Sequence, residues 1–153
     1  RGNMSLLCSS KENSYCISRY RIPRPRIDLG LALGGMASAA MDISDGLFQD
    51  LSHLCGASNV GASVQANKIP LSKEVSTFVN ENKFSIEHVI TGGDDYELIF
   101  TAPVTKEKSI FNLARVTKTR ITRIGTVQSG RGIFIFDKRG NIIPVSKGGY
   151  SHD

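Results

Sequence analysis

The stretch that decides the fold is AMDISDGLFQDLSHLCG at residues 40–56. It continues a run of small apolar residues that extends from Ala37 to Ile43 and stops at charged residues, which is typical of a buried strand whose end reaches the surface. Apolar residues then recur at helical spacing, and they are Leu47, Phe48, Leu51, Leu54 and Cys55. The polar residues on the other side are Gln49, Asp50, Ser52 and His53, and Gly56 ends the pattern. The stretch predicts a strand that passes directly into an amphipathic helix.

Helices and strands alternate along the rest of the chain. Prolines at helix starts and apolar spacing predict helices at residues 25–33, 70–82, around 87 and 105–116. In the first of these, the residues predicted to face the core are Ile27, Leu29, Leu31, Ala32 and Leu33. Strands are predicted at residues 60–66, 96–102, 121–127 and 132–137, and Ser129-Gly130-Arg131 joins the last two as a closing hairpin. This order predicts an α+β domain in which helices pack on a mixed β-sheet.

Length and composition limit what the chain can be. With 153 residues, of which 40% are hydrophobic, the chain fits one compact domain. The net charge of +5 comes from 19 basic and 14 acidic residues that are spread along the chain, so we expect no nucleic acid partner. The longest uncharged stretch, residues 29–41, is shorter than the roughly 20 residues that span a bilayer, and we expect no membrane segment.

The cysteines indicate that the protein resides in a reducing compartment. Cys8, Cys16 and Cys55 form no CxxC pair and cannot all pair with one another, which favours free thiols in a reducing, cytoplasmic environment. The chain opens with Arg1 and not with a methionine, and we interpret it as a fragment.

The turn between the predicted strand and helix is the first candidate site. Asp42, Ser44 and Asp45 place two carboxylates and a hydroxyl beside the positive N-terminus of a helix, where backbone N–H groups are free. Such a turn can hold both a metal ion and a phosphate group, and carboxylate oxygens are ligands that Mg²⁺ prefers. On spacing alone, the alternative is that Ser44 or Asp45 merely caps the helix.

Residues 91–98, TGGDDYEL, form the second candidate site. Gly92 and Gly93 let the backbone approach a ligand closely, and the adjacent acids Asp94 and Asp95 repel each other unless a metal ion or a cationic substrate neutralises them. The alternative is an ordinary glycine turn with solvated acids. Glu97 lies inside the strand pattern, and we expect it to be a structural residue that hydrogen-bonds or faces solvent.

The chain ends in KGGYSHD at residues 147–153. Tyr150, beside two glycines, can stack on a flat heterocycle, with cation–π attraction if that ring is charged. The alternative is a frayed terminus. The three histidines, His53, His88 and His152, have no partners at metal-ligand spacing, and we interpret them as ordinary polar residues.

Several segments together resemble the thiamine-monophosphate kinases, which belong to the aminoimidazole-ribotide-synthetase-like superfamily. In chain order they are Pro23-Arg24-Pro25-Arg26 with Leu29-Gly30, AMDISDGL at 40–47, TGGDDYELIF at 91–100, ITRIG at 121–125 and GGYSH at 148–152. The resemblance covers nearly all of residues 20–152. The combination of GGDDYEL with the closing aromatic-x-His is more specific to this family than DISDGL, which its wider relatives share in looser form.

The resemblance implies an enzyme that transfers the γ-phosphoryl group of ATP to thiamine monophosphate, with Mg²⁺, and that forms a homodimer when complete. By matching position, Asp42 and Asp45 would bind Mg²⁺ and Ser44 would contact ATP. Asp94 and Tyr150 would contact the thiamine substrate. Asp94 stands where the family commonly has glutamate, which shortens the reach of the carboxylate by one methylene.

The resemblance also implies that half of the enzyme is absent. Residues 1–20 would be a linker arm from a missing N-terminal domain, and residues 21–153 would be the C-terminal α+β domain of the superfamily fold. Because the N-terminal domain supplies most of the family's metal-binding aspartates, we expect this chain alone to be inactive. The alternatives are another ATP-dependent superfamily enzyme, selenophosphate-synthetase-like or hydrogenase-maturation-like, and a non-catalytic ligand-binding or dimerisation module.

Overall fold

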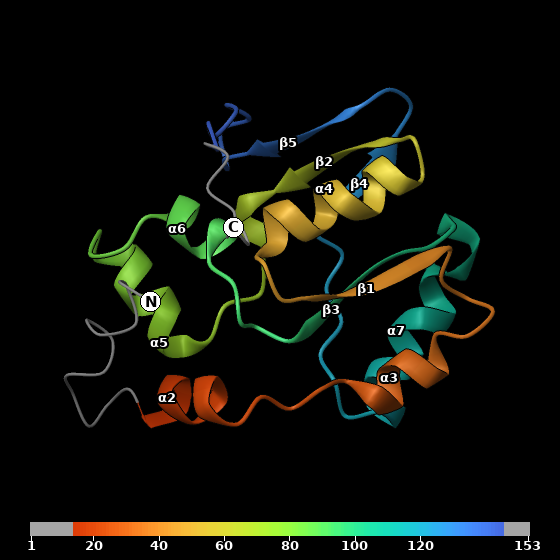
Figure 1. The fold of residues 1–153 in the computed structure, drawn as a ribbon, viewed down its shortest axis with the longest axis horizontal. Coiled ribbons are helices and arrows are strands. Elements are labelled where there is room, and N and C mark those ends of the chain that lie inside the picture. The colour runs from red at the N-terminus through yellow and green to blue at the C-terminus, as the bar shows by residue number, and fades with distance from the viewer. Residues whose placement is uncertain (1–13, 146–153) are drawn as a thin grey trace, which may run out of the picture.

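Strand β1 (Ala39–Ile43) passes into helix α4 (Leu47–Ala57), as the sequence predicts. The computed structural model of the chain describes residues 14–145, and Figure 1 shows how their elements are arranged. Helix α4 contacts β1 and also β2 (Gly61–Gln65) and β5 (Gly132–Phe136). Since these strands belong to two different sheets, α4 joins the sheets into one domain.

The two sheets differ in their pairing. Strand β1 pairs antiparallel with β3 (Glu97–Thr101), so that Ala39 lies opposite Thr101 and Ile43 lies opposite Glu97. The second sheet has the strand order β4-β2-β5, in which β2 runs antiparallel to β4 (Gly125–Gln128) and parallel to β5. The chain is therefore an α+β domain with a mixed sheet, which confirms the predicted fold class.

The last two strands do not form the hairpin that the sequence predicted. Strands β4 and β5 lie on either side of β2 and pair with it. Neighbouring strands are about 4.8 Å apart, so a connection that crosses one strand covers about 10 Å, and the three residues 129–131 are long enough to do so. Ala62 and Val64 of β2 are each 2% exposed, as expected for a strand with neighbours on both edges. Strand β4 also begins later than the predicted Ile121.

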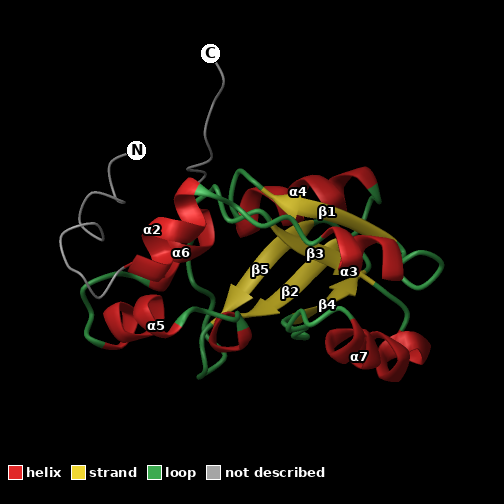
Figure 2. Ribbon diagram, turned by 90° about the horizontal axis from the view of Figure 1, so that it is seen from below, coloured by secondary structure: helices red, strands yellow, loops and turns green. Residues whose placement is uncertain are grey.

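The other helices gather at the two ends of the sheets. Figure 2 shows α2 (Ser14–Arg21), α5 (Lys73–Asn80) and α6 (Ile86–Thr91) at one end, and α3 (Ile27–Ala32) and α7 (Glu107–Val116) at the other. The described residues also contain 3₁₀ turns at Ala66–Lys68 and Val104–Lys106. Helix α2 was not predicted, because its residues lack a sustained apolar period. Helix α5 begins later than Pro70, because the Ser72 hydroxyl accepts the Val75 N–H at 3.2 Å and caps the helix there.

Two apolar clusters hold these elements together. The larger one joins α4 and α6 to both sheets, and its buried residues are Ile43, Leu47, Leu51, Leu54, Cys55, Ala62, Val64, Ala66, Ile90, Ile99 and Ile135. The smaller one, where α3 contacts α7, contains Leu29, Leu33 and Ile110. Within residues 14–145, none of the helices combines the length and the apolar character that a bilayer crossing requires.

The prediction for the core face of α3 is partly wrong. Leu29 and Leu33, four positions apart, share the buried face, and each is 3% exposed. Ile27 and Leu31 lie on the opposite face and are 63% and 78% exposed. A six-residue helix presents only one stripe to a neighbour, so alternate apolar residues cannot all be buried.

Candidate active site

The antiparallel pairing of β1 and β3 brings the two predicted motifs together. Strand β1 ends at Ile43, opposite Glu97, where β3 begins, so the segment after β1 and the segment before β3 lie at the same end of the sheet. The Asp94 N–H donates to the Ser44 carbonyl oxygen at 2.8 Å, and the Tyr96 N–H donates to the Ile43 carbonyl oxygen at 2.8 Å. Residues 44–46 and 92–96 therefore form one unit, which we call the paired loops.

Two glycines allow the paired loops to approach each other. A Cβ atom on Gly46, whose φ is 117°, would lie 2.9 Å from the carbonyl oxygen of Thr91 and 3.0 Å from that of Gly92. A Cβ atom on Gly93 would overlap the carbonyl oxygen of Ser44. Because the obstructing atoms belong to the backbone, no side-chain rotation relieves the overlap. Gly93 thus serves the approach of one protein loop to another, whereas the sequence suggested the approach of a ligand.

Asp50 lies beneath the first of the paired loops, so the prediction that it is on the polar face of the helix is wrong. The residue is 1% exposed. Its Oδ2 atom accepts the backbone N–H groups of Ser44 at 2.9 Å, Asp45 at 3.0 Å and Gly46 at 3.2 Å. The free N–H groups predicted here belong to the first turn of the helix, whereas Asp50 engages those of the loop that precedes it. No local pattern distinguished Asp50 from the solvent-facing polar residues beside it.

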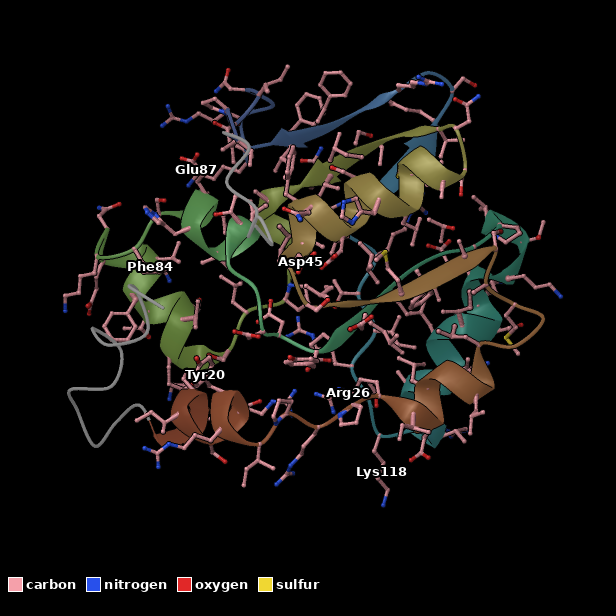
Figure 3. The ribbon with its side chains drawn as sticks, viewed as in Figure 1. Tyr20, Arg26, Asp45, Phe84, Glu87 and Lys118 are labelled. Atoms are coloured by element: carbon pink, nitrogen blue, oxygen red, sulfur yellow. The ribbon has the colours of Figure 1, made fainter. Side chains whose placement is uncertain are left out.

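The carboxylates of Asp42 and Asp45 fit the oxygen donor set that Mg²⁺ requires. Asp42 is exposed on β1, and Asp45 is partly buried just before α4, where Figure 3 labels it. The Gln49 side-chain amide donates to Asp45 Oδ2 at 3.3 Å. Mg²⁺ typically takes one or two protein carboxylates and completes its octahedron with water and phosphate oxygens, so one acid on β1 and one in the loop that follows suit it.

His53 lies close to this site, but its imidazole ring is not a suitable Mg²⁺ ligand. The side-chain ligand atoms of Asp45, Asp50 and His53 lie within 4.8 Å of one another, although His53 was predicted to have no metal-ligand partners. Three N–H groups already engage Oδ2 of Asp50, which leaves Asp45 and His53 as the more accessible pair. Imidazole nitrogen is not a ligand that Mg²⁺ favours, and we leave His53 out of the candidate metal site.

The second of the paired loops concentrates negative charge. Asp94 adopts a left-handed φ of 68°, and the Tyr96 hydroxyl is 3.5 Å from its Oδ1 atom. Asp95 is exposed as a residue, but protein atoms around its carboxyl group desolvate it. This desolvation, with the negative charges of Glu97 and Asp94 and against the positive charge of Arg19, raises the pKa of Asp95 to about 6. A cationic group bound here would relieve the repulsion among these acids.

Two arginines hold Glu97 at the start of β3. Arg26 donates from Nε to Oε2 at 2.7 Å and from Nη2 to Oε1 at 2.6 Å, and Arg19 donates from Nη2 to Oε1 at 2.8 Å. Arg19 belongs to α2, and Arg26, labelled in Figure 3, directly precedes α3. The network ties the N-terminal elements to β3, so Glu97 is the hydrogen-bonding structural residue that was predicted. Its partners Arg19 and Arg26 are 78 and 71 positions away in the chain, so no local pattern indicates them.

A cavity of about 1070 Å³ adjoins the paired loops. Its polar wall contains the acids Asp94, Asp95 and Glu97 together with Arg19 and Arg26. Its apolar wall includes Ile43, Leu47 and Ile99, and two rings of α2, Tyr15 and Tyr20, also line it. The cavity also extends along residues 118–127, and a space of this size with polar groups on an apolar wall can hold a small organic ligand.

We expect the stability of the chain to fall as pH rises through the range in which Asp95 ionises. The folded-state pKa of Asp95, about 6, lies above the ordinary value of 3.8, so the folded state binds this proton more tightly. The stabilising contribution is complete below about pH 4 and is lost between about pH 4 and pH 6. The Asp95→Asn variant should therefore be more stable than the wild type at pH 7, by about 1 kcal/mol, since solvent screens an exposed residue.

Urea unfolding at intervals between pH 4 and pH 7 measures this effect. Asp28→Asn is the control, because Asp28 is an exposed acid in the first turn of α3 and lies outside the paired loops. The prediction would be contradicted if the free energy of unfolding changed equally with pH in the wild type and in Asp95→Asn over this range.

Four of the five residues predicted to bind metal or substrates lie in or directly beside the paired loops. They are Asp42, Ser44, Asp45 and Asp94. Tyr150 lies outside the described residues. The structure thus brings together the residues of two motifs that are far apart in the chain, and adds Asp50 beneath them.

The chain is similar in sequence and in structure to known proteins. The thiamine-monophosphate kinase of Aquifex aeolicus (strain VF5) is 34% identical over 145 residues, which cover 91% of this chain and 45% of that protein. The solved structure of AaThiL complexed with AMPPCP and TMP has a TM-score of 0.75 and 33% identity, over 94% of this chain and 43% of that one. The crystal structure of thiamine-monophosphate kinase from Stenotrophomonas maltophilia K279a has a TM-score of 0.69 and 39% identity, over 74% of this chain and 35% of that one.

The chain spans less than half the length of these relatives. The profile of the family described as "AIR synthase related protein, C-terminal domain" matches residues 19–138, which include both paired loops and both sheets. The chain therefore belongs to the AIR synthase related proteins, as a C-terminal domain of that family.

Proposed function

We propose that the chain is the C-terminal half of a thiamine-monophosphate kinase. The complete enzyme transfers the γ-phosphoryl group of ATP to the phosphate of thiamine monophosphate and releases thiamine diphosphate and ADP. The observation that carries the proposal is the pair of hydrogen bonds between the loops, from Asp94 to Ser44 and from Tyr96 to Ile43. They hold an acidic loop suited to Mg²⁺ against an acidic loop suited to a cation, beside a cavity of about 1070 Å³.

The chemistry of the reaction matches these residues. The acceptor is already an anionic phosphate, so the transfer needs little help from a general base and depends on positioning and charge neutralisation. A phosphate oxygen of thiamine monophosphate forms the new bond to the γ-phosphorus, and the bond from that phosphorus to the β-bridging oxygen breaks as ADP leaves. When bound, Mg²⁺ would neutralise charge on the phosphate oxygens.

We assign a role to each candidate site residue of this half. Asp42 and Asp45 hold Mg²⁺. Ser44, which lies between them in the sequence, contacts the nucleotide. Asp94 attracts the cationic thiazolium ring of thiamine, and the raised pKa of Asp95 supports a site that favours a cation. Tyr150 packs on the rings of the substrate.

The relatives support the same proposal. The name thiamine-monophosphate kinase and the complex of AaThiL with AMPPCP and TMP both belong to proteins about twice as long as this chain. We therefore propose that the other half of the enzyme supplies further metal and nucleotide contacts, and that the complete protein is a cytoplasmic homodimer. On this proposal, the chain alone has no kinase activity.

A kinase assay of the full-length gene product, beside the 153-residue chain, tests the proposed function. We expect the full-length protein to form thiamine diphosphate and ADP in equal amounts from thiamine monophosphate and ATP when Mg²⁺ is present. The 153-residue chain should form neither. A full-length protein that consumes ATP with another acceptor, and leaves thiamine monophosphate unchanged, would point to a different enzyme of the superfamily.

A further inference from the structure

The burial of Asp50 calls for a physical explanation beyond packing. An aspartate that is 1% exposed loses its hydration, which is costly unless hydrogen bonds replace it. Three N–H groups converge on its Oδ2 atom at 2.9, 3.0 and 3.2 Å. Hydrogen bonds to an ionised carboxylate are stronger than neutral ones, and the positive end of α4 adds to them. The three backbone hydrogen bonds therefore replace the hydration that the Asp50 side chain loses on burial.

The N–H groups that Asp50 accepts belong to the loop and not to the helix. An ordinary cap accepts N–H groups from the first turn of the helix that it precedes. The cap position of α4 is Gly46, which has no side chain to do so. Asp50 instead reaches back from the first turn of α4 to residues 44–46, which precede the helix. Its contacts fix the loop that carries Asp45 and follows Asp42.

The loop is held from both sides. On its N–H side, the Asp50 carboxylate binds residues 44–46. On its C=O side, the carbonyl oxygens of Ile43 and Ser44 accept N–H groups from Tyr96 and Asp94, each at 2.8 Å. With both sides of the backbone engaged, the loop has little freedom, and it fixes the Ser44 and Asp45 side chains directly after Asp42, the exposed acid of β1.

We propose that Asp50 is a positioning residue that presents Asp42 and Asp45 to the metal ion and keeps the loop N–H groups from binding phosphate. This inference rests on the proposed function, because it assigns phosphate binding in this half to the metal ion held by two carboxylates. The Asp50 carboxylate already engages the N–H groups of residues 44–46, so these groups are not available to a phosphate group. The phosphate groups of the nucleotide are consequently held through the metal ion and not by this loop's backbone.

The Asp50→Asn variant of the 153-residue chain tests the inference without any kinase activity. Asparagine has the same shape but no charge, so the N–H groups of residues 44–46 lose a charge-assisted acceptor. In amide NMR spectra, we expect the proton signals of these residues to shift upfield and to exchange with solvent at least about tenfold faster. Mn²⁺ titration, followed by paramagnetic broadening of signals near Asp42 and Asp45, should show metal binding about 10- to 100-fold weaker, as for other groups that orient metal ligands.

Asp137→Asn is the matched control, because Asp137 also accepts backbone N–H groups, from Arg139 and Asn141, in a turn on the C-terminal side of β5. It should change the signals of its own turn and leave Mn²⁺ binding unchanged. Asp50→Glu, which keeps the charge on a longer side chain, serves as a second variant and should recover part of the Mn²⁺ affinity. Equal Mn²⁺ affinity in the wild type and in whichever Asp50 variants fold would overturn the inference.

The full-length protein separates this inference from the proposed function. In Asp50→Asn, the KM for Mg²⁺ should rise about 10- to 100-fold, and excess Mg²⁺ should restore part of kcat, which a general loss of stability does not predict. If the wild type makes no thiamine diphosphate while Mn²⁺ binding to the chain depends on Asp50, the proposed function fails and the positioning role stands. If the wild type is an active kinase and Asp50→Asn has an unchanged KM for Mg²⁺, the positioning role fails.

Discussion

The Asp42→Asn variant of the full-length kinase is expected to lose about 100-fold or more in kcat/KM for thiamine monophosphate. Asparagine removes one of the two carboxylates that we assign to Mg²⁺ and leaves only a neutral amide oxygen. The residue is exposed on β1, so its replacement disturbs no packed neighbour and should leave the stability of the fold within about 0.5 kcal/mol. The loss should therefore arise from metal binding and not from unfolding.

Steady-state kinetics over a range of Mg²⁺ concentrations measure this effect, together with a urea unfolding curve for each variant. Asp28→Asn is the control, because it makes the same chemical change at an exposed position on α3, and it should keep wild-type kinetics. A full-length Asp42→Asn enzyme with wild-type kcat/KM and unchanged Mg²⁺ dependence would remove Asp42 from the metal site.

The Gly93→Ala variant is expected to destabilise the chain by about 3 kcal/mol or more. Its Cβ atom would overlap the Ser44 carbonyl oxygen and lie 3.3 Å from the carbonyl carbon of Asp45. The loops must then separate, which breaks the hydrogen bond from Asp94 to Ser44. Since that bond joins the two motifs, the same substitution should also abolish most of the activity of the full-length enzyme.

Gly56→Ala provides a control of opposite sign. Gly56 lies near the end of α4, and a Cβ atom there meets nothing within 4 Å. Alanine is favoured over glycine inside a helix, so this variant should gain about 0.5–1 kcal/mol. Urea unfolding of the wild type and both variants gives the comparison, and a Gly93→Ala chain as stable as the wild type would show that the loops do not need this close approach.

Much of the secondary structure followed from local patterns in the sequence. The strand and helix around residues 40–56 were predictable, because their apolar side chains recur at the spacing of one buried face. The hairpin predicted for β4 and β5 was wrong, because a short turn between two strands does not specify which strand each will pair with. Helix α2 was not predicted, because its residues carry no local apolar period that would indicate a helix.

The sequence by itself determined which side chains are available for chemistry. The acids and glycines of DISDG and GGDDY were recognisable, because each motif is a short run of neighbouring residues. Only the tertiary structure decided how these groups are used. It joined the two motifs through the pairing of β1 with β3, turned Asp50 inward and brought Arg19 and Arg26 to Glu97. The physical reason is that periodicity reports contacts within one element, whereas these hydrogen bonds depend on which distant elements pack together.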